Sequence, residues 1–403
     1  MPSDLRELLR SAAALPSEPL DLDQALRRGR RRRSARRLGV TVISLTFIVA
    51  ATALVARIPS ADRGEGTRPQ QPAQAEANID PRVTAKIDVG PIPEVVAVDA
   101  AGVWVSVLDD EHSGEGFSLV RIDPENNGVV ARLPVDIPVD HLGAGDGALW
   151  ATGFDKDLQQ EVLLKLDPQT GRRLGMLSGI RTPAMNGRLA IGEGAVWVLS
   201  ERVADGTIVR VNPETVEVEA EISLGDPVLV QDIEIGEGSI WVLVARVNGE
   251  NVGPADIVRI DPATNKIAAR IPLDAHAPWI AVGEGSVWVP GWLHDFEDVG
   301  TGEGDRPVVV RIDASTNEVA GDPIPIHTTF RALGVGAGGV WFIAGPEKPS
   351  GVCRLNSQTL EVDECVDPGR FAEVAFEPAA LDITRGIIWV SNSQASVTRI
   401  DLW

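Results

Sequence analysis

The feature that most constrains the fold is an internal repeat that occurs seven times and is marked by tryptophan. Each unit contains an alternating apolar segment, a tight turn such as Gly236-Glu-Gly238, a strand bearing the tryptophan, and a segment such as Arg259-Ile-Asp-Pro262. The seven tryptophans are Trp104, Trp150, Trp197, Trp241, Trp288, Trp341 and Trp389, at spacings of 46, 47, 44, 47, 53 and 48 residues. Strand-rich repeats of this length are typical of β-propellers.

Each repeat has the pattern of four antiparallel strands. Glycine adopts positive φ at little cost, so Gly-Glu-Gly between two apolar alternations predicts a tight hairpin between the first two strands. Asp-Pro followed by Thr-Asn or Thr-Gly predicts a second turn, and a fourth strand follows it, as in residues 129–135 or 267–273. The period of two and the absence of a long helical pattern exclude helical solenoids. We therefore predict an all-β, seven-bladed β-propeller over residues 81–403.

The two ends of the repeat region fit together. The last repeat stops at Trp403, after its third strand, and residues 83–89 (VTAKIDV) have the pattern of a fourth strand. The N-terminal strand is therefore expected to pair into the last blade and to close the ring, which removes the exposed sheet edges.

The first 57 residues differ from the rest in charge. They contain 11 basic and 5 acidic side chains, a net charge of +6, whereas the whole chain has a net charge of −21, so the remainder carries −27. Such an acidic surface argues against a nucleic-acid partner. Eight arginines between residues 27 and 37 precede the uncharged segment 38–56. In a helix these 19 residues would span about 28 Å, the thickness of a bilayer core.

This charge distribution predicts a single-pass protein of the cell membrane. The positive-inside rule makes residues 1–37 a cytoplasmic basic tail, 38–57 a transmembrane helix and 58–80 a flexible linker, with the propeller extracytoplasmic. The alternative is a cleaved signal peptide, which ordinarily has shorter basic and apolar regions than these. The tail could dock a cytoplasmic partner, or it could serve only for insertion.

The two cysteines, Cys353 and Cys365, fall in the third and fourth strands of the sixth repeat. Cross-strand neighbours have Cβ atoms close enough for a disulfide. We expect that disulfide in an oxidising compartment, with two free thiols as the alternative.

The repeated motif x-G-E-G-S-V-W-V followed by V-x-R-I-D-P-x-T-N-x-V resembles the bacterial propeller repeats of the virginiamycin B lyase (streptogramin lyase) group and of related membrane-anchored surface propellers. The resemblance covers Val83–Trp403 and is carried by packing and turn residues. It implies a propeller that serves either as a lyase, with a His, Glu and metal site at one mouth of the ring, or as a binding or sensor domain. The five histidines form no clustered pattern and tyrosine is absent, so no catalytic position is carried over.

The first strand of every blade lines the channel of a propeller, so the distance of a residue from the next tryptophan predicts which way its side chain points. Positions eight and six residues before it are apolar in every repeat and are predicted to pack between blades. Positions nine and seven before it then face the axis, and position ten lies at the mouth, where Glu94, Asp140 and Gln231 also fall. The predicted ligand-binding residues are His141, Arg188, Asp232, Glu234, Trp279, Arg331 and Asp382.

These residue types could form a ligand pocket. They offer an aromatic platform, a guanidinium group for an anion and carboxylates that could hold a divalent cation, the one cofactor considered. The alternative is a water-filled channel whose charges pair with one another. The acidic segment Trp292–Arg306 could bind calcium or could be a solvated loop.

The sequence therefore predicts a membrane-anchored extracytoplasmic propeller that binds an unidentified ligand or protein in a sensor-like role. One alternative is a lyase or hydrolase with a metal-assisted site at the channel mouth. Another is a scaffold without a small-molecule site.

Overall fold

The computed structural model describes residues 80–402, apart from the gaps 100–101, 111–114, 181–188, 201–205, 226–227, 249–250, 294–305, 329, 346–350, 369–380 and 393–394. All regular structure in these residues is β-strand. No helix in this part of the chain is long and apolar enough to cross a bilayer. The predicted tail, transmembrane helix and nearly all of the linker lie outside the described residues.

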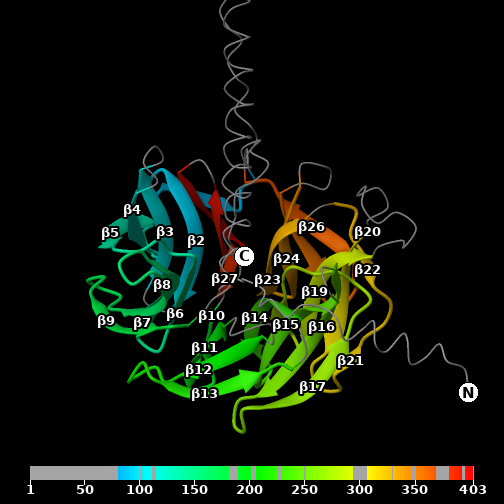
Figure 1. Ribbon diagram of the computed structural model, residues 1–403. Helices are drawn as coiled ribbons and strands as arrows, with labels where there is room; N and C mark the ends of the chain where they lie inside the picture. The colour runs from blue at the N-terminus through cyan, green and yellow to red at the C-terminus, as the bar shows by residue number, and fades with distance from the viewer. Residues whose placement is uncertain are drawn as a thin grey trace, which may run out of the picture. The chain divides into compact units, whose positions relative to one another are not determined.

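The strands form seven antiparallel sheets, as the tryptophan repeat predicted, and each sheet is one blade (Figure 1). We number the blades in chain order. Blade 1 contains β2 (Ile92–Asp99), β3 (Gly102–Asp110), β4 (Glu115–Asp123) and β5 (Gly128–Val135). Blade 2 contains β6 (His141–Gly145), β7 (Ala148–Asp155), β8 (Gln160–Leu166) and β9 (Arg173–Ser178). Blade 3 contains β10 (Leu189–Gly192), β11 (Ala195–Ser200), β12 (Thr207–Val211) and β13 (Val218–Ser223). Blade 4 contains β14 (Val228–Gly236), β15 (Ser239–Asn248), β16 (Asn251–Asp261) and β17 (Lys266–Pro272).

Blades 5 and 7 depart from this regular pattern, and blade 6 keeps it. Blade 5 contains β18 (Ala281–Gly283), β19 (Ser286–Leu293), β20 (Arg306–Asp313) and a divided outer strand, β21 (Glu318–Val319) and β22 (Ile324–Pro325). Blade 6 contains β23 (Phe330–Gly336), β24 (Gly339–Ala344), β25 (Gly351–Asn356) and β26 (Val362–Val366). Blade 7 contains β27 (Leu381–Thr384), β28 (Ile387–Asn392), β29 (Ser396–Asp401) and, from the start of the repeat region, β1 (Val83–Asp88).

The first strands of the blades form a closed inner ring. Each packs against the first strand of the next blade, and β27 packs against β2 to complete the circle. Figure 1 shows β2, β14 and β27 toward the centre and the outer strands β9, β13 and β17 at the periphery.

The ring is closed as the sequence predicted, by β1 pairing with β29 in antiparallel register. Ile87 lies opposite Val397 and Asp88 opposite Ser396. Ile87 is 7% exposed and packs in one cluster with Val103 of blade 1 and Trp389 of blade 7. The N-terminal strand therefore completes the last sheet and also joins the last blade to the first.

The seven tryptophans are the largest buried side chains, none more than 1% exposed. In every blade the basic residue of the third-strand motif stacks over the indole ring, 5.1 to 5.7 Å from the ring centroid, for example Arg259 over Trp241. A cation over an indole face is attracted by the ring quadrupole. The basic residue was visible in the sequence motif, but its stacking role was not predicted.

Four of these basic residues also join neighbouring blades at the turn between strands three and four: Lys165, Arg210, Arg259 and Arg399. Arg259 Nη1 donates to the carbonyl of Ala314 and to Asn317 Oδ1, at 2.8 and 2.9 Å. Arg399 Nη1 makes the equivalent bonds across the closure of the ring, to Pro124 O at 2.5 Å and Asn127 Oδ1 at 2.9 Å. The last blade is thus held to the first by the Arg399 side chain as well as by the packing of β1.

Two-residue turns connect the first and second strands of blades 2 to 7, where the structure describes the connecting residues. In blade 4, Glu237 and Gly238 both have positive φ, 51° and 68°, the geometry of a type I′ hairpin. Glu237 Oε1 accepts a hydrogen bond from the amide of Gly285 in the next blade's turn, at 2.9 Å. The acid in the Gly-Glu-Gly motif therefore links adjacent turns.

Glycine five residues before the tryptophan allows the blades to approach closely. A Cβ at Gly236 would lie 2.5 Å from Val282 Cγ1, and one at Gly145 would lie 2.7 Å from Ile191 Cγ2. Val282 and Ile191 are six residues before their own tryptophans, so the structure confirms that this apolar position packs between blades.

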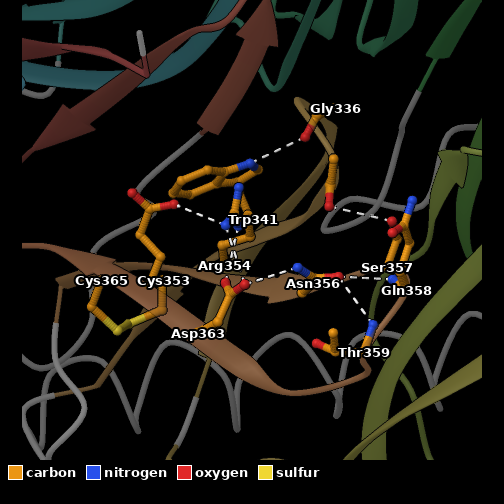
Figure 2. A network of polar contacts seen from close by, with 12 residues as sticks. Gly336, Trp341, Cys353, Arg354, Asn356, Ser357, Gln358, Thr359, Asp363 and Cys365 are labelled. Atoms are coloured by element: carbon orange, nitrogen blue, oxygen red, sulfur yellow. Dashed lines mark hydrogen bonds and ion pairs between the residues drawn. A yellow bond between two sulfur atoms is a disulfide. The ribbon is translucent and has the colours of Figure 1, made fainter.

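Blade 6 contains the predicted disulfide, with Cys353 directly opposite Cys365 on β25 and β26 (Figure 2). Beside it, Arg354 stacks on Trp341 and donates to both carboxylate oxygens of Asp363, at 3.0 and 3.2 Å. The hydrogen bond from Arg354 is the main cause that lowers the pKa of Asp363. This arginine pairs within its own blade, because the next blade has no turn between strands three and four for it to reach.

Candidate functional site

The antiparallel order gives the propeller two different faces. The turns between strands one and two and between strands three and four lie at one end of every blade, which we call the turn face. The loops between strands two and three and the connections between blades lie at the other end, which we call the loop face. Turns between strands one and two are two residues long in blades 2 to 7, whereas the strand bounds leave loop-face segments of 2 residues (249–250) to 14 residues (367–380).

A cavity of about 270 Å³ lies along the inner ring on the side of blades 1 to 4. Its wall includes Ala97, Gly143 and Ala190, three of the small residues that the sequence placed toward the axis. Glu234 of β14 is the charged residue of this wall and is half-buried. The structure therefore puts the Glu234 carboxylate in an otherwise small and apolar channel lining. The full set of residues lining the cavity is Val96, Ala97, Val98, Leu142, Gly143, Ala144, Leu189, Ala190, Ile191, Glu234 and Ile235.

Acidic side chains also gather where the first strands of blades 1 and 2 begin, at the loop face. Burial raises the pKa of Asp140 to about 6, and the negative charges of Glu161 and Glu94 contribute to the shift. Burial also raises the pKa of Glu94. Asp140 is exposed and directly precedes β6, so this carboxyl group lies at the loop-face end of blade 2. Glu94 and Asp140 were placed at the mouth by their distance from the tryptophans, and Glu161 of β8 was not anticipated.

Asp232 has a different surrounding from the one expected of an axis-facing residue. It is completely buried, and its Oδ2 accepts a hydrogen bond from the amide of Ile280 in the next blade, at 2.8 Å. Its Oδ1 accepts from the amide of Ile233, also at 2.8 Å. The pairing of β14 with β15 has an irregular register between Val230 and Asp232, so simple alternation fails there. Asp232 joins blade 4 to blade 5 and does not present an open carboxylate to the channel.

Four of the other predicted residues lie in or next to the first strands of their blades. His141 begins β6 and is half-buried, opposite Thr152. Trp279 precedes β18, is half-buried and packs against the apolar cluster between blades 5 and 6. Arg331 and Asp382 lie in β23 and β27, the first strands of blades 6 and 7, as expected. Arg188 lies outside the described residues. Ligand binding by this set remains a prediction.

Metal binding has no support in the described part of the chain. Its His, Cys, Asp and Glu side chains include no group of three arranged to hold a metal ion. Most of the acidic segment 292–306 lies outside the described residues, so its calcium-binding interpretation remains a prediction.

A second cavity, of about 490 Å³, lies at the periphery between blades 5 and 6. It lies between the outer strands β22 and β26 and was not anticipated. The residue sequence Gly321-Asp322-Pro323 was the available signal, because it interrupts the outer strand of blade 5.

Comparison with known proteins identifies the fold. No protein-family model and no curated protein matches the sequence. The structure is similar to the Pan2 WD40 domain of Neurospora crassa, with a TM-score of 0.53 and 11% identity over 78% of this chain and 94% of that one. It is similar to a chain of Kuenenia stuttgartiensis hydrazine synthase, with a TM-score of 0.55 and 12% identity over 78% of this chain and 96% of that one. It is also similar to a chain of a mitotic checkpoint complex, with a TM-score of 0.55 and 10% identity over 86% of this chain and 99% of that one.

These identities show a shared β-propeller fold and nothing finer. The propeller is commonly a protein-binding module, and the same fold carries unrelated functions. The resemblance to the virginiamycin B lyase group remains one of repeat motifs.

Proposed function

We propose that the chain is a single-pass membrane protein whose extracytoplasmic propeller binds a ligand or a partner protein at its loop face, in a sensor-like role. The observation that carries the proposal is the placement of Glu234 in the channel wall, with Glu94 and Asp140 at the loop-face end of the same inner ring. Connecting segments on a rigid scaffold are where binding residues concentrate, and the loop face holds all the long connections of this propeller.

Two independent features support the extracytoplasmic location. The arginine-rich segment directly before residues 38–56 favours a cytoplasmic N-terminus. The disulfide between Cys353 and Cys365 suits an oxidising compartment, because cytoplasmic thiols are kept reduced.

The proposed pocket combines Glu234 with Trp279, Arg188, His141, Arg331 and Asp382. Its ligand would have an apolar or aromatic part for Trp279 and polar groups for the carboxylates and guanidinium groups. Asp232 is not a member of this proposed pocket, because its carboxylate accepts hydrogen bonds from backbone amides of blades 4 and 5.

Binding is tested by a thermal-shift screen of the purified full chain in detergent against divalent cations and small polar metabolites. A true ligand raises Tm in proportion to the logarithm of its concentration above Kd. Arg188→Ala and Trp279→Ala should each weaken that shift by at least about tenfold in apparent Kd, since each removes a direct contact. Lys266→Ala, on the exposed outer strand β17, is the matched control. If neither pocket variant changes the binding of any hit, the pocket is disproved.

Topology is tested separately. A reporter enzyme that is active only outside the cytoplasm, fused after Trp403, should be active, and one fused before Ser3 should not. The reverse result would place the propeller in the cytoplasm and would remove the basis for an extracellular ligand.

A further inference from the structure

The cavity between blades 5 and 6 is an open groove that brings one half of the disulfide toward solvent. Its volume is about 490 Å³, with Ile324 and Ile326 of blade 5 along one wall and Val362 and Cys365 of blade 6 along the other. Cys365 is half-buried, whereas Cys353 is completely buried. Volumes of a few hundred Å³ are typical of sites for small molecules. A small molecule in this groove would therefore meet Cys365 and not Cys353.

The groove exists because the outer strand of blade 5 is incomplete. The other six blades have a continuous outer strand of five to eight residues, whereas β21 and β22 have two residues each. Gly321-Asp322-Pro323 lies between these two short strands, and proline cannot donate a ladder hydrogen bond. A full outer strand of blade 5 therefore does not border the part of blade 6 that contains Cys365.

The order of the strands determines which sulfur atom can be attacked. Disulfide exchange begins when a thiolate approaches one sulfur in line with the S–S bond and displaces the other sulfur. Cys365 lies on β26, the outermost strand of blade 6, which pairs with β25 alone among the described strands. Cys353 lies on β25, and Phe342 of β24, 1% exposed, lies directly opposite it on the inner side. A thiolate can therefore reach Cys365 from the free edge, and Cys353 is the sulfur that leaves.

The chain enters the propeller next to this disulfide. Arg82, directly before β1, donates from Nη2 to the carbonyl oxygen of Cys365 at 3.5 Å. Its Nη1 forms an ion pair with the carboxylate of Glu364, the residue before Cys365. The disulfide holds both of these partners in place by joining β26 to β25. Opening the disulfide would therefore weaken the contacts of Arg82 and, through Arg82, the start of the strand that closes the ring.

We propose that Cys365 is an exchange site for low-molecular-weight thiols, and that exchange there loosens the contacts between Arg82 and β26. The thiolate of the incoming molecule forms a bond to Cys365 Sγ, the bond from Cys365 to Cys353 breaks, and its electron pair stays on Cys353 Sγ. Cys353 lies in an apolar cluster with Ile324 and Leu355, which disfavours a thiolate, so Cys353 takes up the proton that the incoming thiol lost. The exchange consumes one thiol and needs no further oxidant or reductant.

The exchange is reversible. Its product has a small group linked to Cys365 in the groove and a buried thiol at Cys353. Because the Cys353 thiol stays beside the mixed disulfide, it can attack Cys365 again and release the small thiol. The modified fraction of the protein therefore follows the concentration of thiol around it. Nothing in this exchange depends on what the loop face binds.

Mass spectrometry of the full chain in detergent tests the site. After incubation with mercaptoethanol and quenching with acid, the mixed disulfide should lie on Cys365, and Cys353 should be a free thiol. The amount of mixed disulfide should rise with the mercaptoethanol concentration. A mixed disulfide on Cys353, or exchange that begins only in denaturant, would overturn the proposal. Reaction with a thioredoxin-like protein but not with mercaptoethanol would overturn it as well.

Single-cysteine variants provide a matched comparison of the two sulfur positions. In the folded protein, Cys353→Ala should react with a small disulfide reagent at least about tenfold faster than Cys365→Ala, because only the thiol of Cys365 can be reached. Equal Tm values show that both variants are folded to the same extent. Equal reaction rates would contradict the predicted access from the groove.

A variant that narrows the groove tests the route of entry. His327→Trp adds an indole ring at an exposed position of the groove wall and should slow the formation of the mixed disulfide severalfold. Asp274→Trp is the matched control, because Ile271-Pro-Leu-Asp274 of blade 4 repeats the pattern Ile324-Pro-Ile-His327 and Asp274 is also exposed. Equal exchange rates in the two variants would show that the thiol does not enter through the groove.

Hydrogen exchange followed by mass spectrometry tests the effect on Arg82. In the mixed-disulfide form, the amides of β1 should exchange about twofold to fivefold faster, the effect of losing one partly exposed ion pair. The amides of β13, the outer strand of blade 3, should be unchanged. Arg82→Met should reproduce the faster exchange in the unmodified protein, and mercaptoethanol should add no further increase. Unchanged exchange in β1, or an equal increase in β13, would overturn the link between Cys365 and Arg82.

Discussion

The turn face and the loop face are built from the same seven repeats, yet the repeated acids of the turns bond to the backbone of the turns, whereas Asp140 on the loop face lies among other acids. On the turn face, Asp261 accepts the amide of Ala263 and the hydroxyl of Thr264, Arg259 reaches the next turn, and Glu237 binds the turn beyond its own. On the loop face, burial raises the pKa of Asp140 to about 6, and the negative charges of Glu161 and Glu94 contribute to the shift.

This difference predicts which substitutions on each face should affect stability and which should affect ligand binding. A polar group that is satisfied inside the fold stabilises the ring and is unavailable to a ligand. Like charges that crowd together cost stability, and such groups are candidates for binding. Stability should therefore depend on the core and the turn face, and binding on the loop face.

The largest effect is expected from the core tryptophans that both faces share. Trp241→Ala should lower the free energy of unfolding by about 3–5 kcal/mol, because it leaves a large cavity beneath Arg259. Trp279→Ala, at the half-buried loop-face position, should cost clearly less. Denaturant titration followed by circular dichroism measures both, and equal losses would show that Trp279 is a core residue and not a binding platform.

The next effect concerns the closure of the ring on the turn face. Arg399→Met should lower the free energy of unfolding by about 1.5–3 kcal/mol, because it removes the charged hydrogen bonds to Pro124 and Asn127 while keeping the aliphatic packing. Arg399→Lys should recover part of the loss. Lys266→Ala, on an exposed strand, controls for the loss of a positive charge. If Lys266→Ala were equally destabilising, the hydrogen bonds of Arg399 across the ring closure would not explain the loss.

A smaller effect on stability is expected when Glu237, in the turn after β14, is compared with Glu234 within β14. Glu237→Ala should cost about 1 kcal/mol, since it removes the hydrogen bond to Gly285, and should leave ligand binding unchanged. Glu234→Gln should change stability little and should abolish the binding of any hit from the thermal-shift screen. Loss of binding in Glu237→Ala, with binding retained in Glu234→Gln, would place the binding site at the turn and not in the channel wall.

The smallest effect is a pH dependence at the channel mouth. The folded-state pKa of Asp140 is about 6, above its value in an unfolded chain, so its contribution to stability is fully present below about pH 4 and is lost as the pH rises through 6. Asp140→Asn should therefore raise Tm slightly above pH 6 and not below pH 4. Because the side chain contacts solvent, we expect a change below about 1 kcal/mol. Parallel Tm profiles for both proteins would show that Asp140 is not perturbed.

The repeat made most of the fold predictable. The spacing of the tryptophans, the Gly-Glu-Gly turns and the unmatched strand at residues 83–89 sufficed for the blade number and for the closure, because each depends on short-range patterns repeated in register. The apolar position six residues before each tryptophan was also correctly assigned to the space between blades. The disulfide was predictable because a hairpin brings its two strands into register.

The site was less predictable. Alternation placed Glu234 in the channel wall but misjudged Asp232, because an irregular pairing next to Gln231 changes the phase of the strand. The stacking of arginine on tryptophan is a cross-strand contact within one blade, as between Trp241 and Arg259, and it depends on the register between the second and third strands. The clustering of Glu161 with Asp140 also lies within blade 2 and depends on side-chain directions that the repeat pattern does not specify.

The sequence by itself determined the seven blades, their strand order and the partner of the first strand, since hydrophobic periodicity and turn chemistry act locally. Only the tertiary structure decided which polar groups form hydrogen bonds between blades, as Asp232 and Arg399 do. It also decided which polar groups are exposed at the loop face, as Asp140 is. The physical reason is that hydrogen bonding and desolvation between blades depend on distances set by ring closure, and those distances arise only when all seven repeats are packed.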